Sequence, residues 1–303
     1  MKCVRCGKEA SIKVLAPLCN ECFIISYENR VEKVIKKFRL IDKNDKVLVA
    51  VSGGKDSLSC ALVLSKLRDK LNFEMEILTM DVNTYCFSNK IKEFVEDFSK
   101  RINVKFNFIS FKDYFGFNKK LEDWIKERKI KRPVCSVCGM LKRYAINKFA
   151  RENGFNKIAT GHCANDIARF FIKNLIGKNL EYISKLKPIV YSEHPKQVTR
   201  IRPLYECLEF ENLNYVKLNN LNPISSCSFY MMKDRFYRII SLIEEKDRKF
   251  LIEFVRGLEE LNFETRKEKI FECRICGEPT NKEVCSVCRL LNKEWRIFIS
   301  KYY

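Results

Sequence analysis

The chain has 303 residues, 46% of them hydrophobic, with 58 Lys and Arg against 38 Asp and Glu, a formal net charge of +20. This composition suits a folded core of one or two domains, and it contains no apolar run of about 18 residues and no secretory signal. We therefore expect a cytoplasmic protein without a membrane span. The positive charge is typical of nucleic-acid binding, although Lys-rich genomes and thermophily give the same balance. Fifteen cysteines indicate metal binding rather than disulfides, and two histidines leave little room for histidine-based catalysis.

The first 25 residues contain two CxxC pairs, formed by Cys3, Cys6, Cys19 and Cys22. Four thiolates at this spacing can close tetrahedrally on one Zn²⁺, and so short a segment does not fold without its metal. Since sulfur fills every coordination position, we expect a structural zinc ribbon at residues 1–25. An amphipathic helix over residues 27–39 is predicted to follow.

Residues 47–51 form an apolar, β-branched run that predicts a buried strand, and a helix pattern starts at residue 56. Between them stands the sequence SGGKDS, which comprises Ser52, Gly53, Gly54, Lys55, Asp56 and Ser57. A glycine-rich turn from a strand into a helix presents unpaired backbone N–H groups, which suits a phosphate. It is not a Walker loop, because Val49 and Asp56 stand where that pattern requires Gly and Ser or Thr. The turn resembles the PP-loop of N-type ATP pyrophosphatases, which implies ATP binding.

From residue 45 the pattern alternates between strands and helices, so we expect an α/β fold with a parallel sheet and helices on both faces. Strands are predicted at 46–51, 74–81, 104–110 and 157–160, and helices at 56–70, 88–101, 118–129, 138–152 and 166–176. Ligands of such sheets lie at the carboxyl ends of the strands near the switch point. We therefore expect the SGGKDS loop, Asp81, Gly161 and His162 around one nucleotide cleft, with capping as the alternative role of Asp81.

A central CxxC pair, Cys135 and Cys138, is predicted to open a helix, with Lys142 one turn beyond Cys138 on the same face. A helix N-terminus lowers the pKa of a thiol and favours metal or sulfur chemistry. Taken by itself, the pair is half of a zinc knuckle or a redox pair. Further along, Asp166 stands at the start of a predicted helix, where a carboxylate stabilises the helix dipole.

The last hundred residues are predicted to be mainly helical. Residues 200–204 indicate a short strand or edge segment, and helices are expected near 209–219, 230–246 and 248–261. A polar loop before the second of these helices holds the lone Cys227. The later helices mix basic and aromatic residues, which suits RNA or a solvated amphipathic face. A second four-cysteine zinc ribbon followed by a helix is expected at residues 263–303, after a catalytic domain at 26–262; its ligands are Cys273, Cys276, Cys285 and Cys288.

Together these motifs resemble the tRNA 2-thiolation (2-thiouridine synthetase) family of TtuA type and its wobble-uridine relatives, over essentially the whole chain. The resemblance implies a PP-loop (adenine nucleotide alpha hydrolase-like) fold and an ATP-dependent tRNA-uridine 2-sulfurtransferase. It also implies a [4Fe–4S] cluster on Cys135, Cys138 and Cys227, whose fourth iron stays open to sulfide. The alternative is a persulfide on one cysteine with a disulfide partner.

The resemblance further implies that ATP and Mg²⁺ occupy residues 52–57, with Asp56 near the metal. The uridine O2 would attack the α-phosphate, and sulfur would then displace AMP. Lys142 would stabilise charge at the α-phosphate or the base, and Asp166 would handle a proton or bind metal. The implied partners are tRNA, a sulfur donor (free sulfide or a thiocarboxylated ubiquitin-like carrier) and a second copy in a homodimer.

The chain departs from the family at the GHNxDD motif, which reads Gly161-His162-Cys163-Ala164-Asn165-Asp166 here. Arg169 also stands where Gln or Glu is usual. These changes leave open an altered substrate or reduced activity. Two rival hypotheses are another PP-loop ATP-dependent ligase, which would not need the three cysteines, and a catalytically decayed RNA-binding paralogue.

Overall fold

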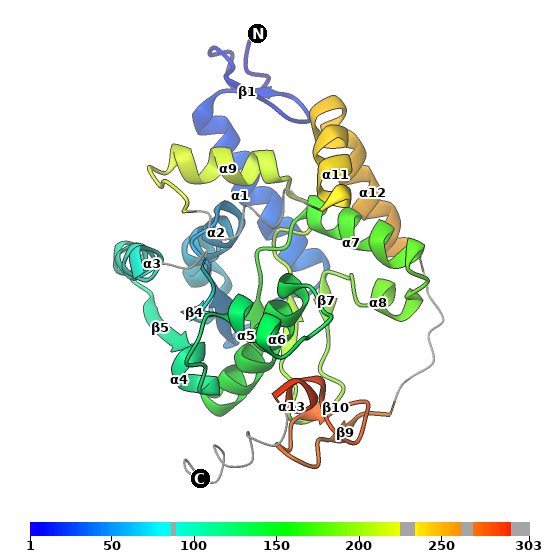
Figure 1. The fold of residues 1–303 in the computed structure, drawn as a ribbon. Coiled ribbons are helices and arrows are strands. Elements are labelled where there is room, and N and C mark those ends of the chain that lie inside the picture. Colours follow the sequence, from blue (N-terminus) through cyan, green and yellow to red (C-terminus); the bar gives the residue numbers. More distant parts are fainter. Residues whose placement is uncertain (86–88, 225–233, 262–268, 292–303) are drawn as a thin grey trace.

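A six-stranded sheet forms the centre of the molecule, in the order β5-β4-β3-β6-β8-β7 (Figure 1). The computed structural model describes residues 1–85, 89–224, 234–261 and 269–291. Neighbouring strands are parallel except for β7, which pairs antiparallel with β8. The strands are β3 (Lys46–Ala50), β4 (Glu74–Asp81), β5 (Lys105–Ser110), β6 (Lys157–Ala159), β7 (Ile189–Val190) and β8 (Thr199–Ile201). The expected α/β sheet is therefore confirmed, with one antiparallel edge strand added.

Helices cover both faces of the sheet, because successive side chains of a strand point to opposite faces. Val47 and Val49 pack into one core and Leu48 into the other. The first core is covered by α1 (Asn20–Lys37), α2 (Lys55–Leu71), α3 (Asn89–Arg101), α7 (Ala164–Ile176), α9 (Glu209–Leu218), α11 (Arg235–Lys246) and α12 (Arg248–Glu260). The second core is covered by α4 (Phe111–Phe115), α5 (Leu121–Glu127), α6 (Val134–Glu152) and α13 (Ser286–Leu291).

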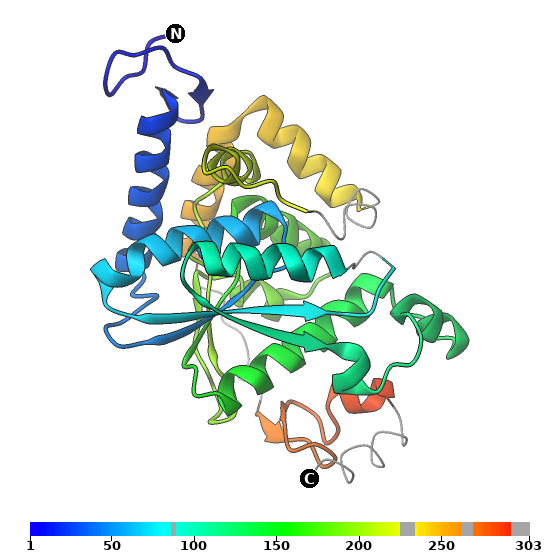
Figure 2. The same cartoon turned by 90° about the vertical axis from the view of Figure 1, so that its left-hand side faces the viewer.

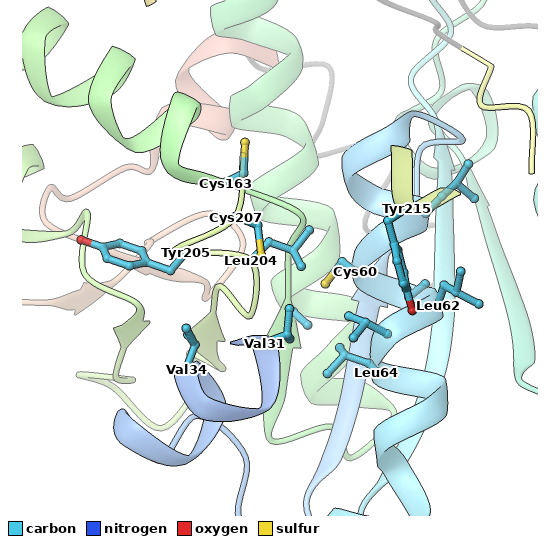
Figure 3. Packing of buried hydrophobic residues seen from close by; sticks show 14 of the residues in the cluster. Val31, Val34, Cys60, Leu62, Leu64, Cys163, Leu204, Tyr205, Cys207 and Tyr215 are labelled. Carbon is cyan, nitrogen blue, oxygen red and sulfur yellow. The ribbon is translucent and has the colours of Figure 1, made fainter. Parts of the chain in front are cut away.

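The first core joins segments that are far apart in the sequence (Figure 3). Val31 comes from α1, Leu64 from α2 and Tyr215 from α9, and all three side chains are fully buried. The rings of Tyr27 and Tyr215 stack at 4.3 Å between centroids. α1 and α9 are thereby held against α2, the helix that starts at the SGGKDS loop.

Several helix starts differ from the predicted ones. α1 begins at Asn20, directly after Cys19, and α6 begins at Val134 with Pro133 as its N-cap. We expected the second of these helices to begin four residues later, at residue 138. Proline fixes φ near the helical value and therefore favours a helix start directly after it. The helix predicted at 118–129 is the shorter α5, and α4 and α8 (Leu180–Ser184) were not predicted. Residues 230–233 and the helix expected through Trp295 and Phe298 lie outside the described residues.

The two cysteine-rich segments lie at opposite ends of the molecule (Figures 1 and 2). The N-terminal segment contains β1 (Ile12–Lys13) and β2 (Pro17–Leu18), and the C-terminal one contains β9 (Phe271–Glu272) and β10 (Pro279–Thr280). α1 runs without a break through the expected domain boundary at 25–26, and the boundary at 262–263 falls outside the described residues. Arg151 of α6 holds the C-terminal segment through both oxygens of Glu278, at 2.6 and 2.9 Å. Among the described residues no helix is long and apolar enough to cross a membrane.

Candidate active site

The candidate site lies where the strand order of the sheet reverses. From β3 the chain proceeds through β4 and β5 on one side, and through β6 and β8 on the other. The carboxyl ends of β3 and β6 therefore flank the switch point, where open α/β sheets bind their ligands. The SGGKDS loop follows β3, and Gly161 and His162 follow β6, as the sequence predicts.

The SGGKDS loop is shaped by its own hydrogen bonds and by one left-handed glycine. Gly53 has φ of +82°, a conformation that residues with a Cβ rarely adopt. The Ser57 hydroxyl accepts from the Ser52 backbone N–H at 3.1 Å and donates to the Gly54 carbonyl at 3.0 Å. Gly54 caps α2, a helix of 17 residues whose N-terminal N–H groups therefore open onto this loop.

Gly161 packs directly against the backbone of this loop. A Cβ at Gly161 would lie 2.6 Å from the carbonyl carbon and oxygen of Asp56, and 2.8 Å from the backbone nitrogen of Ser57. Such distances are not possible between nonbonded atoms, so only glycine fits here. The segment after β6 and the start of α2 are thus in direct backbone contact.

His162 lies beside this contact as a neutral side chain. Its Nδ1 is 2.8 Å from the Thr160 hydroxyl. Burial lowers the pKa of His162 to about 4, and the charges of Arg202, Arg169 and Arg143 act in the same direction.

Two residues of α9, Glu209 and Asn212, complete the polar part of the site, and neither was predicted from the sequence. The Lys55 ammonium lies 3.1 Å from the Asp56 carboxylate and 2.9 Å from that of Glu209. Asn212 donates to the other oxygen of Asp56 at 2.8 Å. Burial raises the pKa of Asp56 to about 6, although Lys55 opposes this shift. A phosphate approaching the loop would therefore meet a lysine held between two carboxylates.

Asp166 is engaged by its own helix. It accepts from the backbone N–H of Cys163 at 3.4 Å, which confirms the predicted capping role, and pairs with Arg169 at 2.7 Å. Arg169, one of the departures from the family pattern, thus neutralises Asp166. Asn165 stands where the family motif has its first Asp. Its side-chain oxygen accepts from the backbone N–H of Glu209 at 3.0 Å and links α7 to α9.

The remaining candidate residues belong to other segments of the chain. Asp81 accepts from the Asn83 backbone N–H at 2.7 Å, which fits its alternative capping role. Cys135 and Cys138 lie in the first five residues of α6, the former exposed and the latter buried. The Lys142 ammonium has no partner among the described parts of the chain. Cys227 lies outside the described residues, but Ile224 donates to the Gly53 carbonyl at 2.9 Å.

Each terminal segment gathers four thiols of the kind that hold zinc. The sulfur atoms of each group all lie within 4.8 Å of one another; the groups are Cys3, Cys6, Cys19 and Cys22, and Cys273, Cys276, Cys285 and Cys288. Tetrahedral Zn²⁺ with sulfur ligands at about 2.3 Å requires thiols at this separation. The arrangement fits the two zinc ribbons that the spacing predicts.

A glycine-rich strand-to-helix loop with Lys and Asp at the switch point defines a PP-loop nucleotide-binding protein. The family model described as the PP-loop domain matches residues 25–226. The chain is 36% identical over 300 residues to the tRNA-5-methyluridine(54) 2-sulfurtransferase of Thermotoga maritima, covering 96% of each chain. It is 35% identical over 316 residues to the protein of that name from Pyrococcus horikoshii, covering 99% of this chain and 97% of that one.

A solved structure shows the same fold. The U34-tRNA thiolase NcsA from Methanococcus maripaludis, with its [4Fe–4S] cluster, superposes with a TM-score of 0.76 at 27% identity, covering 95% of both chains. The chain therefore belongs to the family of PP-loop tRNA 2-sulfurtransferases.

Proposed function

We propose that this protein is an ATP-dependent tRNA-uridine 2-sulfurtransferase. The observation that carries the proposal is the intact SGGKDS loop at the switch point, with Lys55 and Asp56 in place, in a chain of this family. The uridine O2 attacks the α-phosphate of ATP and expels pyrophosphate. A sulfur nucleophile then attacks C2, and AMP leaves with the former O2.

The loop residues hold the nucleotide in this proposal. Backbone N–H groups of residues 52–57 and the Lys55 ammonium bind the phosphates, and Asp56 lies near Mg²⁺. Asp81, Gly161 and His162 border the nucleotide. Lys142 stabilises the negative charge that develops at the α-phosphate or the base. Asp166, paired with Arg169, is assigned to proton handling or metal binding.

The cysteines supply the metal sites of the proposal. Cys135, Cys138 and Cys227 hold a [4Fe–4S] cluster, and the two four-cysteine groups each hold a structural Zn²⁺. Two thiols near the start of one helix fit a shared cluster, and the bond from Ile224 to Gly53 brings the chain next to the loop three residues before Cys227. A cluster with three protein ligands supplies an iron position at which sulfide can bind.

The substrate we propose is the uridine at position 54 of tRNA. This choice is supported by the 36% and 35% identities to relatives named for position 54, against 27% to the thiolase named for position 34. The sulfur comes from free sulfide or a thiocarboxylated ubiquitin-like carrier, and the protein works as a homodimer in the cytoplasm, where ATP and tRNA are available.

Mass spectrometry of nucleosides tests the reaction directly. Unmodified tRNA incubated anaerobically with protein, ATP and sulfide is expected to yield 2-thiouridine, together with AMP and pyrophosphate. Fragment mapping reports position 54 or 34. If ATP is consumed and a different modification appears, the chain is another PP-loop ligase. If neither nucleotide nor tRNA changes, the decayed paralogue is correct.

The cluster has a colour test of its own. Protein purified anaerobically is expected to be brown, and Cys138→Ala should lose both the absorbance and the thiolated product because one iron ligand is gone. Cys207→Ala is the matched control, since Cys207 is fully buried in the apolar core and should keep the colour. A colourless protein with full thiolation activity would instead support the persulfide alternative.

A further inference from the structure

A polar groove lies beside the contact between the C-terminal ribbon and the core, outside the site described above. It consists of two adjoining cavities of about 360 and 450 Å³. The smaller is bounded by α6, β8 and the ribbon, and the larger by α8, β7 and the ribbon. Cavities of this size accommodate small molecules or single nucleotides. Both are lined by Tyr182, Tyr191, Gln197, Thr280 and Asn281.

The floor of the groove carries two arginines that have no acidic partner. Arg143 of α6 and Arg200 of β8 both line the smaller cavity and both reach solvent. Both side chains line one cavity, and surrounding protein, and next the charge of Arg143, lower the pKa of Arg200. In the described ranges neither forms an ion pair or a side-chain hydrogen bond. Two like charges held together in this way favour a bound anion such as a phosphate.

The acidic residues nearby do not neutralise these arginines. Glu278 lines the same cavity but is bound through both oxygens to Arg151. Glu181 and Glu193 line only the larger cavity. The inner part of the groove therefore keeps an uncompensated positive charge.

Two tyrosines project beside this charge with most of their rings in solvent. Tyr182 is 58% exposed and Tyr191 is 64% exposed. The segment between them is fixed, because Arg202 donates to the carbonyls of Lys185 and Lys187. Exposed aromatic rings next to arginines are the usual platform for unpaired bases, and amide and hydroxyl groups such as those of Gln197, Thr280 and Asn281 bond base edges.

We propose that this groove binds unpaired nucleotides of the tRNA substrate, with a backbone phosphate against Arg143 and Arg200 and bases against Tyr182 and Tyr191. The inference rests on the proposed function for the identity of the RNA. It adds a second contact at the C-terminal ribbon. Arg143 shares the helix α6 with Cys135 and Cys138, so an RNA bound in the groove would contact the helix that begins at these cysteines.

Binding of a fluorescently labelled, unmodified tRNA transcript to the metal-loaded full-length protein tests the groove. Tyr191→Ala is expected to weaken binding about fivefold or more, since stacking on one aromatic side chain contributes at least that much. Tyr191→Phe keeps the ring and should bind as the wild type does. Arg200→Gln should reduce the slope of log affinity against log salt by about 0.7, the amount expected for one single-strand phosphate.

The matched control for charge is Arg274→Gln, which removes an exposed arginine of the same ribbon that pairs with Glu283 at 3.1 Å. This variant should leave the salt slope unchanged. In a separate competition experiment, a short single-stranded oligoribonucleotide should displace the labelled tRNA better than an RNA duplex does. Wild-type affinity and slope in both Tyr191→Ala and Arg200→Gln would overturn the groove, even if the protein thiolates tRNA. Loss of binding in these variants supports it, even if the wild type yields no thiolated product.

Discussion

Gly161→Ala is expected to lower the affinity for ATP by about 10²-fold, because a displacement of roughly 1 Å in a binding site has an effect of this size. The new methyl group would lie 2.6 Å from the carbonyl of Asp56 and 2.8 Å from the nitrogen of Ser57. Backbone atoms cannot rotate out of the way as a side chain can. The SGGKDS loop or the end of β6 must therefore move. Calorimetric titration with a non-hydrolysable ATP analogue measures the loss.

Gly257→Ala is the control for this substitution. Gly257 lies in α12, and its added Cβ would have no atom within 4 Å. Alanine in a helix interior should stabilise the protein by about 0.5–1 kcal/mol relative to glycine, with ATP affinity unchanged. If Gly161→Ala binds the analogue as tightly as Gly257→Ala does, the contact between Gly161 and the loop does not shape the nucleotide site.

Lys55→Ala is expected to reduce kcat/KM for pyrophosphate release by about 10²-fold or more, the usual effect of removing one charged donor at a transition state. It also leaves Asp56 and Glu209 without the cation between them. The pKa of Asp56, already raised to about 6, should then rise further. The carboxylate is lost as the pH falls through this pKa, so the acid limb of the pH profile should move to higher pH.

Lys66→Ala on the same helix provides the comparison. Its ammonium pairs with Glu28 at 2.6 Å, away from the loop. Its removal should leave both the rate of pyrophosphate release and the pH profile as they are. Equal rates in Lys55→Ala and the wild type would show that the PP-loop lysine takes no part in the reaction.

The part of the site that could be predicted from sequence is the part built from local segments. The run at residues 47–51 is apolar because both faces of β3 are covered, so strand and loop stand out together. The CxxC spacings likewise encode the two four-cysteine groups, since each knuckle positions its thiols within a few residues.

Glu209 and Asn212 could not be found in this way. They lie 154 and 156 residues from their partners Lys55 and Asp56, and only the packing of α9 against α2 brings them together. In the sequence, an acidic residue at a helix start indicates a cap, and Glu211 in the same turn does have that role. In the sequence nothing distinguishes Glu209 from it; only the folded structure shows that Glu209 contacts Lys55.

The short elements were missed for a different reason. A two-residue strand such as β7 is too short to show alternation, and α8 covers little more than one helical turn. Both are positioned by contacts with distant segments, as β7 is by its pairing with β8. Nevertheless, α8 contains Tyr182 and β7 directly precedes Tyr191, the two tyrosines of the groove.

The hydrogen bond between α9 and α2 also affects when, during folding, the nucleotide site is formed. Tyr27 donates to Asn212 at 2.7 Å, and Asn212 donates to Asp56 at 2.8 Å, so the loop is linked to segments on both sides of it in the chain. Contacts of such sequence separation form slowly, because a long stretch of chain must first be closed. During synthesis, a chain that has not yet released α9 from the ribosome has the complete SGGKDS sequence and Tyr27, but lacks Glu209 and Asn212. The nucleotide site therefore matures only after some two thirds of the protein has been made.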